Sequence, residues 1–243
     1  MIPKIIHYCW FGSKNLDECT NNYVHSWKEI LPDYQIVEWN ESNFNVEYNR
    51  YVKEAYELKK YAFVSDVCRL YALQQMGGIY LDTDVQVIKK FDSFLHDGSF
   101  IGEEQNGKLV GTAVIGAEPG TPWINEFLAK YDSLTFKKRF GALDTTANTE
   151  RLTKFFIKHK EVAPKIYPIE YFCAKDYKTG SITQTPNTVC IHHYAASWVE
   201  PLKFEKYEKK FWSCLGLKNL NILGKIHGRI LTPLKKLFFC LSL

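Results

Sequence analysis

The 243-residue sequence lacks any uninterrupted apolar stretch close to the roughly 20 residues that a membrane-spanning helix needs. Low-complexity runs are also missing, while 46% of the residues are apolar and 15% aromatic, enough to fill a sizeable core. The N-terminus has no charged start, apolar stretch and cleavage site of the kind found in a signal peptide. These absences favour a globular protein that stays in the cytoplasm.

Close pairs of cysteine are missing as well. The seven cysteines lie far apart, at Cys9, Cys19, Cys68, Cys173, Cys190, Cys214 and Cys240. Zinc sites and disulfide frameworks usually show short, regular cysteine spacings. The odd number and the wide spacing therefore predict reduced thiols in a reducing compartment.

Charge is distributed unevenly along the chain. Residues 1–200 carry 22 Lys/Arg against 25 Asp/Glu, a net −3, whereas residues 201–243 carry 9 against 2, a net +7. This asymmetry argues against a nucleic-acid binder and directs attention to what the tail touches. We expect a main domain over residues 1–200 and a basic amphipathic helical extension over residues 201–243.

The extension mixes Leu, Ile and Phe with Lys and Arg, and Pro233 interrupts it. Its composition is typical of a helix that lies in a membrane interface, so an anionic inner membrane surface is the partner that we predict for it. Packing of this segment on the main domain or on a partner chain is the alternative.

Apolar runs alternate with helical patterns, which predicts an α/β fold with a mainly parallel central sheet. Expected strands cover residues 3–10, 34–39, 79–81, 85–88, 100–102, 109–116 and 189–193, and expected helices cover 20–31, 54–76, 123–131 and 150–160. The first strand, helix and second strand suggest a βαβ unit. Gly77-Gly78 supplies the stop of the longest helix.

Asp82 and Asp84 stand two residues apart after an apolar strand. In extended backbone both carboxylates project to the same side. Two hard oxygen ligands at the end of a strand suit Mn²⁺ or Mg²⁺, with a diphosphate completing the coordination shell. An isolated pair of this kind is more often a solvated turn, so its neighbours decide between the two interpretations.

Those neighbours lie on the preceding helix and turn. Ser65-Asp66 and Arg69 precede the aspartates, and Asp66 and Arg69 are helix neighbours at i, i+3. A solvated surface ion pair is the alternative interpretation, but Asp66 and Arg69 share their helix face with apolar residues. The carboxylate can accept hydrogen bonds from sugar hydroxyls, and the guanidinium can bind sugar or phosphate oxygens.

A second group of polar residues follows a short apolar strand at His192-His193, with Ser197-Trp198 just beyond. Adjacent histidines on a strand face opposite ways, so one of them enters a site readily, as a metal or phosphate ligand. A structural histidine is the alternative. Ser197 and Trp198 either bind phosphate and wall off a pocket or simply cap and fill.

Three segments together resemble glycosyltransferase family 32. They are IPKIIHYCWFG at residues 2–12, the block from Ala62 to Val85 (A-x-x-S-D-x-x-R through GGIYLDTDV), and HH-x-x-x-SW at residues 192–198. They occur in the family's order over residues 2–200. That family includes bacterial capsular-polysaccharide enzymes and yeast-type mannosyltransferases, and is similar to the catalytic domains of clostridial glucosylating toxins.

The resemblance implies a GT-A catalytic domain over residues 1–200, a divalent metal and retention of anomeric configuration. It implies catalytic roles for Asp82, Asp84, Asp66 and Arg69, and metal binding by Asp82, Asp84, His192 and His193, with His192 preferred as the inward histidine. Substrate-binding positions implied in the same way are His7, Trp10, Gly12, Ser65, Tyr80, Ser197 and Trp198. No side chain is identified as a nucleophile, so the protein mainly supplies positioning and electrostatics.

The function we predict is a metal-dependent retaining glycosyltransferase. It moves a hexose from a UDP- or GDP-sugar to a glycan or lipid-linked glycan acceptor, in cell-surface or capsular polysaccharide synthesis, on the inner face of the membrane. A sugar-nucleotide hydrolase and a non-catalytic membrane- or nucleic-acid-binding protein are the alternatives. Residues 111–113 and 144–150 lie where an acceptor loop is expected, although ordinary loops and a helix cap explain them equally well.

Overall fold

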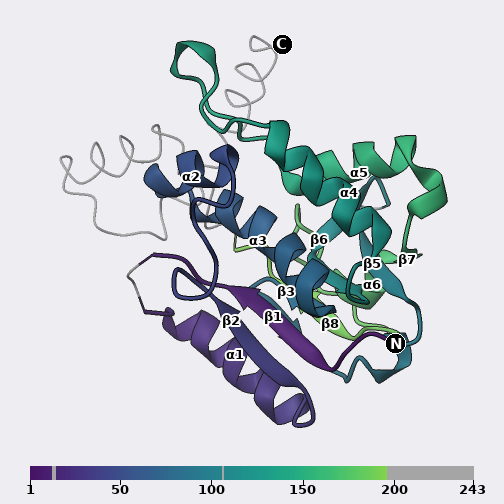
Figure 1. Cartoon of the computed structure of the whole chain (residues 1–243). Coiled ribbons are helices and arrows are strands. Elements are labelled where there is room, and N and C mark those ends of the chain that lie inside the picture. The colour runs from purple at the N-terminus through teal and green to yellow at the C-terminus, as the bar shows by residue number, and fades with distance from the viewer. Residues whose placement is uncertain (13–14, 106, 196–243) are drawn as a thin grey trace, which may run out of the picture. The chain divides into compact units, whose positions relative to one another are not determined.

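The central sheet confirms the predicted α/β class. The computed structural model describes residues 1–12, 15–105 and 107–195 (Figure 1). In the main sheet the strands follow the order β2 (Gln35–Trp39), β1 (Ile5–Cys9), β3 (Gly78–Leu81), β6 (Leu109–Ala117), β5 (Ser99–Glu104) and β7 (Lys165–Tyr167). β1 is parallel to β2 and β3, and β5 is parallel to β7, whereas β6 runs antiparallel to both its neighbours. The sheet is therefore mainly parallel, with β6 as its reversed strand.

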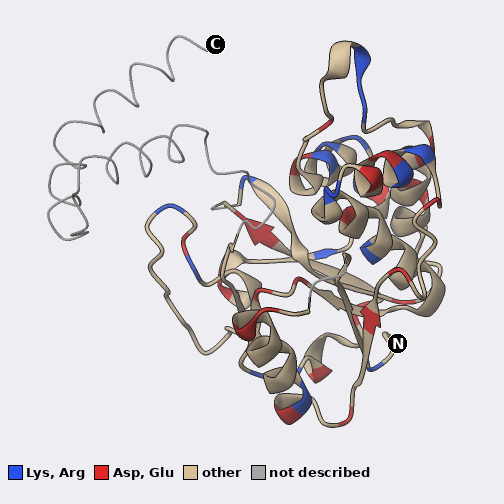
Figure 2. Ribbon diagram, turned by 90° about the vertical axis from the view of Figure 1, so that its left-hand side faces the viewer, with Lys and Arg blue, Asp and Glu red and all other residues tan. Residues whose placement is uncertain are grey.

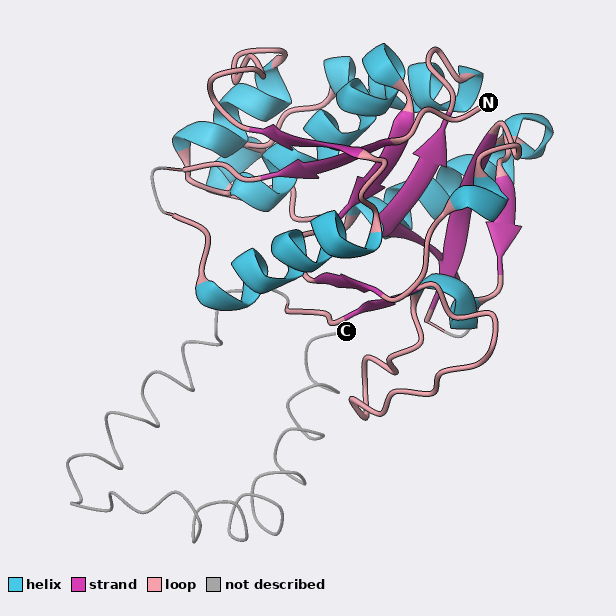
Figure 3. Ribbon diagram, turned by 90° about the horizontal axis from the view of Figure 1, so that it is seen from below, coloured by secondary structure: helices cyan, strands magenta, loops and turns pink. Residues whose placement is uncertain are grey.

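Helices cover both faces of this sheet (Figure 3). They are α1 (Glu18–Ile30), α2 (Arg50–Glu57), α3 (Tyr61–Met76), α4 (Pro122–Lys130), α5 (Asn148–Lys158) and the short α6 (Ile169–Phe172), with 3-10 turns at Asp92–Phe94, Tyr131–Ser133, Arg139–Gly141 and Lys160–Val162. Side chains of β3 alternate between two cores: Ile79 and Leu81 face the core that includes α1, and Tyr80 faces the core of α2 to α5. Burial on both faces explains the continuous apolar character of this strand.

The predicted βαβ unit is present at the start of the chain. Asp17 caps α1, since its Oδ1 accepts a hydrogen bond of 2.9 Å from the Thr20 amide, and the helix ends just before Leu31-Pro32. Because β1, β2 and β3 are parallel, their carboxyl ends lie at one edge of the sheet. Ligands of open α/β sheets bind at such an edge.

The helix predicted over residues 54–76 is instead two helices, α2 and α3. The chain turns between them at Lys59, which has a φ of 57°. Both helices pack on the same apolar core, so the apolar spacing continues across the break and hides it. The predicted stop is confirmed, because Gly77 and Gly78 have φ values of 62° and 99°, and a Cβ at Gly78 would lie 2.6 Å from the Ile5 carbonyl oxygen.

The sequence suggested that residues 85–88 resume the strand of residues 79–81. They form a strand, but it belongs to a different sheet. β4 (Val85–Val87) pairs instead with β8 (Cys190–His192) in a separate antiparallel ladder. The indole Nε1 of Trp27 on α1 donates a hydrogen bond of 2.9 Å to the Val85 carbonyl and holds this ladder against the helix. β7 and α6 were not predicted.

Among the described residues, no helix is long and apolar enough to cross a membrane. Acidic and basic residues are interspersed along the described ribbon (Figure 2). The predicted interfacial helix in residues 201–243, together with Ser197 and Trp198, lies outside the described residues.

Candidate active site

The Asp82-Thr83-Asp84 segment forms a tight turn between β3 and β4. The Asp82 amide donates to the Ala113 carbonyl of β6 at 2.9 Å, and the Val85 amide donates back to the Asp82 carbonyl at 3.0 Å. The backbone is therefore not extended at this point, contrary to the sequence interpretation. The convergence that we expected is nevertheless present, because Asp82 and Asp84 each place a carboxylate oxygen within 4.8 Å of the other and of a His192 ring nitrogen.

The β4–β8 ladder positions His192. Val85 is the register partner of His192, so the histidine lies beside the aspartate that precedes β4. Its Nε2 is 3.4 Å from Asp84 Oδ1, and the other carboxylate oxygen of Asp84 accepts a hydrogen bond of 2.7 Å from the Ala195 amide. The predicted preference for His192 as the inward residue agrees with this geometry.

His193 lies outside this cluster. Its Nε2 is 3.0 Å from Gln86 Oε1, and its ring stacks on Tyr23 with centroids 5.2 Å apart. The alternation of side chains along the strand sends the two histidines to opposite sides. Of the two histidines named as candidate metal ligands, His192 lies with Asp82 and Asp84 in the described structure and His193 does not.

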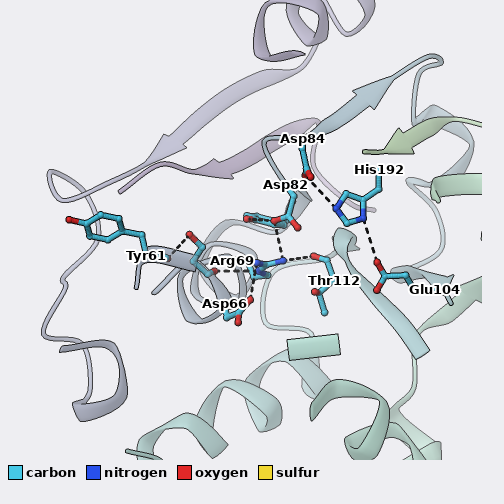
Figure 4. A network of polar contacts seen from close by, with 10 residues as sticks. Tyr61, Asp66, Arg69, Asp82, Asp84, Glu104, Thr112 and His192 are labelled. Carbon is cyan, nitrogen blue, oxygen red and sulfur yellow. Dashed lines mark hydrogen bonds and ion pairs between the residues drawn. The ribbon is translucent and has the colours of Figure 1, made fainter. Parts of the chain in front are cut away.

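Arg69 joins the helix α3 to the aspartate turn (Figure 4). Its Nη2 is 2.9 Å from Asp66 Oδ1, and its Nη1 is 3.2 Å from Asp82 Oδ1. The same Nη1 donates to the Thr112 carbonyl of β6 at 2.6 Å, and the Tyr80 hydroxyl donates to Asp82 Oδ1 at 2.9 Å. Arg69 therefore contacts both Asp66 and Asp82 directly, and the sequence placed all three residues in one site.

Burial controls the ionisation of this network. Asp66 lies in a buried position, and desolvation raises its pKa to about 6, with repulsion from Asp82 adding to the rise and Arg69 opposing it. Burial also opposes the charge on Arg69, but Asp82, Tyr80 and Asp66 outweigh it and raise the pKa of the guanidinium. Arg69 therefore stays charged between the two carboxyl groups.

The second carboxylate of the turn is held ionised. Burial opposes the charge of Asp84, but His192 and the Ala195 amide more than compensate and lower its pKa below the usual value. Burial likewise opposes protonation of His192, yet Asp84, Cys173 and Glu104 raise its pKa well above the usual value. Asp84 and His192 therefore stabilise each other's charged forms.

A cavity of about 520 Å³ lies at the carboxyl ends of β1 and β2. Its lining residues are Trp10, Gly12, Asn15, Leu16, Asn21, Glu38, Asn40 and Glu41. Gly12 has a φ of 93°, its amide donates to Glu41 Oε1 at 2.7 Å, and a Cβ would lie 2.6 Å from the Tyr61 ring. Two predicted substrate-binding positions, Trp10 and Gly12, therefore share a cavity large enough for a nucleoside.

Other predicted positions have different surroundings. His7 is 0% exposed; its Nε2 is 2.7 Å from the Gly77 carbonyl, and its Nδ1 accepts from the Trp39 indole at 3.0 Å. Both ring nitrogens are thus used inside the core, so His7 has no route to a substrate in this structure. Ser65 is partly buried on α3, where its hydroxyl donates to the Tyr61 carbonyl at 3.1 Å.

The two segments suggested for an acceptor loop also have clear roles. Residues 111–113 belong to β6 and contribute the Thr112 carbonyl to Arg69. Asp144 is buried and lies 2.6 Å from Arg151 Nη2, an ion pair that ties the loop to α5. Neither observation identifies an acceptor.

The sequence interpretation missed Glu104 and Cys173, which lie beside His192. Glu104 ends β5, and its Oε1 is 3.4 Å from His192 Nδ1 (Figure 4). An acidic residue at the end of an apolar strand was the available signal, the same that marks Asp82. It was not sufficient, because only the tertiary structure brings β5 next to β8.

The donor set of Asp82, Asp84 and His192 fits a divalent cation. Two carboxylates and an imidazole suit Mn²⁺ or Mg²⁺, which accept few protein ligands and complete their shell with phosphate or water. The side chains of Asp82 and Asp84 are 27% and 18% exposed, so the site is open to solvent. The three side chains are close enough to bind one ion together.

Comparison with known proteins agrees with this chemistry. Residues 17–101 match the family described as "Glycosyltransferase sugar-binding region containing DXD motif". The match includes Asp66, Arg69 and both aspartates of the turn. The site is therefore similar to the sugar-binding region of DXD glycosyltransferases.

Two mannosyltransferases of Schizosaccharomyces pombe are similar in sequence. Inositol phosphoceramide mannosyltransferase 3 is 26% identical over 162 residues, which cover 61% of this chain and 42% of that protein. Inositol phosphoceramide mannosyltransferase 1 is 29% identical over 211 residues, which cover 81% of this chain and 62% of that protein. The chain thus matches less than two thirds of the length of either relative.

A solved structure supports the fold. PaToxG glycosyltransferase has a TM-score of 0.54 and 19% sequence identity, with 66% of this chain and 73% of that chain covered. The structure of this chain is accordingly GT-A-like. The particular resemblance to family 32 stays a prediction.

Proposed function

We propose that this chain is a metal-dependent glycosyltransferase that moves a hexose from a nucleotide-diphosphate sugar to a glycan acceptor. The observation that carries the proposal is the convergence of Asp82, Asp84 and His192 within 4.8 Å, at the sheet edge that also holds the Trp10 cavity. The match of residues 17–101 to DXD sugar-binding regions supports it. Retention of configuration and a role in capsular polysaccharide synthesis belong to the same proposal.

Each part of the site then has a task. The cavity beside Trp10 and Gly12 would hold the base and ribose, and Asp82, Asp84 and His192 would hold the cation. Bound there, Mn²⁺ or Mg²⁺ neutralises the charge that develops on the departing diphosphate. Asp66 accepts hydrogen bonds from hydroxyls of the donor sugar.

Arg69 keeps these parts in register. It contacts Asp66, Asp82 and the Thr112 carbonyl at the same time, so the sugar-binding carboxyl and the cation-binding carboxyl are fixed relative to each other. Such fixed positioning lowers the barrier of a transfer reaction without a protein nucleophile. Described side chains therefore act by positioning and by electrostatics.

The names of the relatives indicate which donor sugar to test first. Two of them are named mannosyltransferases, so a mannosyl donor is the first to test on this chain. UDP-galactose, UDP-glucose and UDP-N-acetylhexosamine complete the panel. A lipid-linked glycan is the acceptor class that we propose, with the net +7 segment 201–243 docking on an anionic inner membrane surface.

Thermal unfolding of the full chain with each nucleotide sugar, in Mn²⁺ and in EDTA, tests the donor site. A ligand at 100 times its Kd stabilises the folded state by about 2.7 kcal/mol. We expect this gain with one nucleotide class, its loss in EDTA and in Asp84→Asn, and its retention in Asp132→Asn, an exposed carboxylate outside the cluster. Stabilisation that is equal in Mn²⁺ and EDTA contradicts the metal-dependent site.

Product analysis separates transfer from hydrolysis. With donor, Mn²⁺ and a lipid-linked glycan, we expect an elongated glycan and free nucleoside diphosphate in equal amounts. Free sugar in place of the elongated glycan would support a sugar-nucleotide hydrolase. Flotation with anionic liposomes, with and without residues 217–243, tests the docking segment, and equal flotation of both forms excludes it.

A further inference from the structure

A second group of metal-binding side chains lies behind His192. Glu104 at the end of β5, Cys173 just after α6 and His192 on β8 place a carboxylate oxygen, a thiol sulfur and a ring nitrogen within 4.8 Å of one another. Glu104 and Cys173 are 5% and 4% exposed. An isolated antiparallel bridge between Cys173 and Ile191 fixes the thiol beside the strand that carries the histidine.

The two ring nitrogens of His192 face different partners. Nε2 faces Asp84, whereas Nδ1 faces Glu104, and each pair of atoms is separated by 3.4 Å. Nδ1 is buried and has no well-formed hydrogen bond to a described residue. Beside the Glu104 carboxylate, such an atom is a position where a water or an ion can bind.

The separation and the chemistry of the three donors both fit zinc. Bonds of about 2.0–2.1 Å from a tetrahedral Zn²⁺ to nitrogen and oxygen place those two ligands roughly 3.3–3.4 Å apart. Nδ1 and Glu104 Oε1 have this separation. A thiolate, an imidazole and a carboxylate are the ligands that zinc takes, and three of them leave a fourth position open.

We propose that Glu104, Cys173 and His192 form a zinc site separate from the Asp82–Asp84 cation site, and that the two sites compete for His192. On binding, Zn²⁺ forms bonds to sulfur, Nδ1 and the carboxylate; the thiol proton and the Nδ1 proton pass to solvent. Neutral imidazole has a single lone pair. With zinc on Nδ1, Nε2 keeps its hydrogen, donates it to Asp84 and is unable to bind the other cation.

Only the competition rests on the proposed function. The zinc site itself depends on three side chains and needs no sugar nucleotide. Zinc would act as an inhibitor of the transferase by withdrawing one of the three cation ligands. The two sites then favour different metals. The thiolate of the Glu104–Cys173–His192 site favours zinc, whereas the carboxylates of the Asp82–Asp84 site, together with phosphate, favour Mn²⁺ or Mg²⁺.

Titration of the full chain with Co²⁺, followed by absorption, tests the site, since cobalt replaces zinc and shows a thiolate-to-metal charge-transfer band. We expect the band in the wild type and in Asp84→Asn, and its loss in Cys173→Ser. Cys190→Ser is the matched control. Cys190 is a buried thiol on β8, the strand of His192, and its Sγ lies 3.7 Å from the Phe172 carbonyl oxygen; it is not one of the three donors. Glu104→Gln should weaken Co²⁺ binding at least about tenfold.

Absence of the band in the wild type, or an equal band in Cys173→Ser, overturns the zinc site. Circular dichroism checks that each variant is folded. If Cys173→Ser is unfolded, Glu104→Gln decides, and unchanged Co²⁺ affinity in that variant overturns the site as well.

Mn²⁺ binding, followed by electron paramagnetic resonance, tests the competition. We expect one equivalent of Zn²⁺ to release Mn²⁺ from the wild type and from Cys190→Ser, and a higher Zn²⁺ concentration to be needed for Cys173→Ser, where zinc competes only by direct exchange at the Asp82–Asp84 site. If the cobalt band forms while Mn²⁺ stays bound, the competition is wrong and the zinc site stands. If Asp84→Asn binds Mn²⁺ as tightly as the wild type, the cation site of the proposed function fails, and the cobalt result is unaffected.

Discussion

The main-sheet core around His7 and the β4–β8 ladder around His192 each hold a histidine, and the pKa values of the two imidazoles are shifted in opposite directions. His7 is hydrogen-bonded to a carbonyl and an indole, and burial lowers its pKa to about 4. His192 is partly buried, with 12% of its side chain exposed, and Asp84, Cys173 and Glu104 raise its pKa well above the usual value. The neutral form of the imidazole is favoured at His7, whereas the charged forms of Asp84 and His192 are favoured in the ladder.

This difference separates a structural region from a candidate functional one. In the core, neutral partners satisfy His7 and the surrounding residues are apolar, so charge is excluded. At the sheet edge, Asp66 and Arg69 form an ion pair in a buried position and Asp84 faces His192, although desolvation opposes the charge of each of these groups. Groups whose pKa values are shifted by burial and by a charged neighbour are typical of binding and catalytic sites.

Replacing Arg69 by Met breaks the charged region most severely. Asp66 and Asp82 lose a partner that is 6% exposed, and loss of one member of a buried pair costs about 3–5 kcal/mol. We expect this loss in the free energy of unfolding, measured with urea, together with loss of transfer. Arg50→Met is the control, because Arg50 is 70% exposed in its pair with Glu54 and should cost less than about 1 kcal/mol. Equal losses in both variants would show that the network has no special role.

Asp84→Asn tests the charge of the ladder without removing the side chain. We expect kcat/KM to fall on the order of 10³-fold, about 4 kcal/mol, because the cation loses a charged ligand. His192 also loses the carboxylate that faces its Nε2, while the main-sheet core is untouched. Activity assays at several Mn²⁺ concentrations measure the change. Full recovery at high Mn²⁺ would show that Asp84 affects cation affinity alone.

His7→Gln tests the neutral region through pH. The pKa of His7 is about 4 in the folded chain, against a usual 6.5, so the unfolded chain binds more protons between pH 4 and 6.5. The contribution of His7 to stability is therefore complete above pH 6.5 and is lost as pH falls toward 4, a change of about 3 kcal/mol.

We expect His7→Gln to lose this part of the pH dependence of unfolding, measured in urea from pH 4 to 7. His25→Gln is the control, since the side chain of His25 is 73% exposed. A pH profile of His7→Gln parallel to that of the wild type would contradict the neutral burial of His7.

Local patterns predicted one of these regions better than the other. The apolar run before Trp10 and the helix that ends at Gly77-Gly78 report directly on burial, so the parallel sheet and its helices could be predicted. The break at Lys59 could not, because it contains neither Gly nor Pro and both helices share a core.

The charged region depends on contacts between distant segments. Asp82 and Asp84 were predicted to converge, but through extended backbone, whereas a turn brings them together. His192 reaches Asp84 only because β8 pairs with β4, and Glu104 reaches His192 only because β5 ends nearby. Sequence spacing contains no record of such pairings, so the residues closest to the sequence motif could be predicted and Glu104 could not.

Asp17→Ala gives the smallest expected effect and tests how far the sheet edge depends on local structure. Asp17 caps α1, which contributes Asn21 to the cavity and Trp27 to the hydrogen bond on Val85. Loss of an N-cap carboxylate costs about 1 kcal/mol. We expect that decrease in the free energy of unfolding, and hydrogen exchange that is faster in α1 and β4 than in β1 and β3. If exchange rises equally in all four elements, α1 unfolds only with the whole domain, and the edge is as rigid as the core around His7.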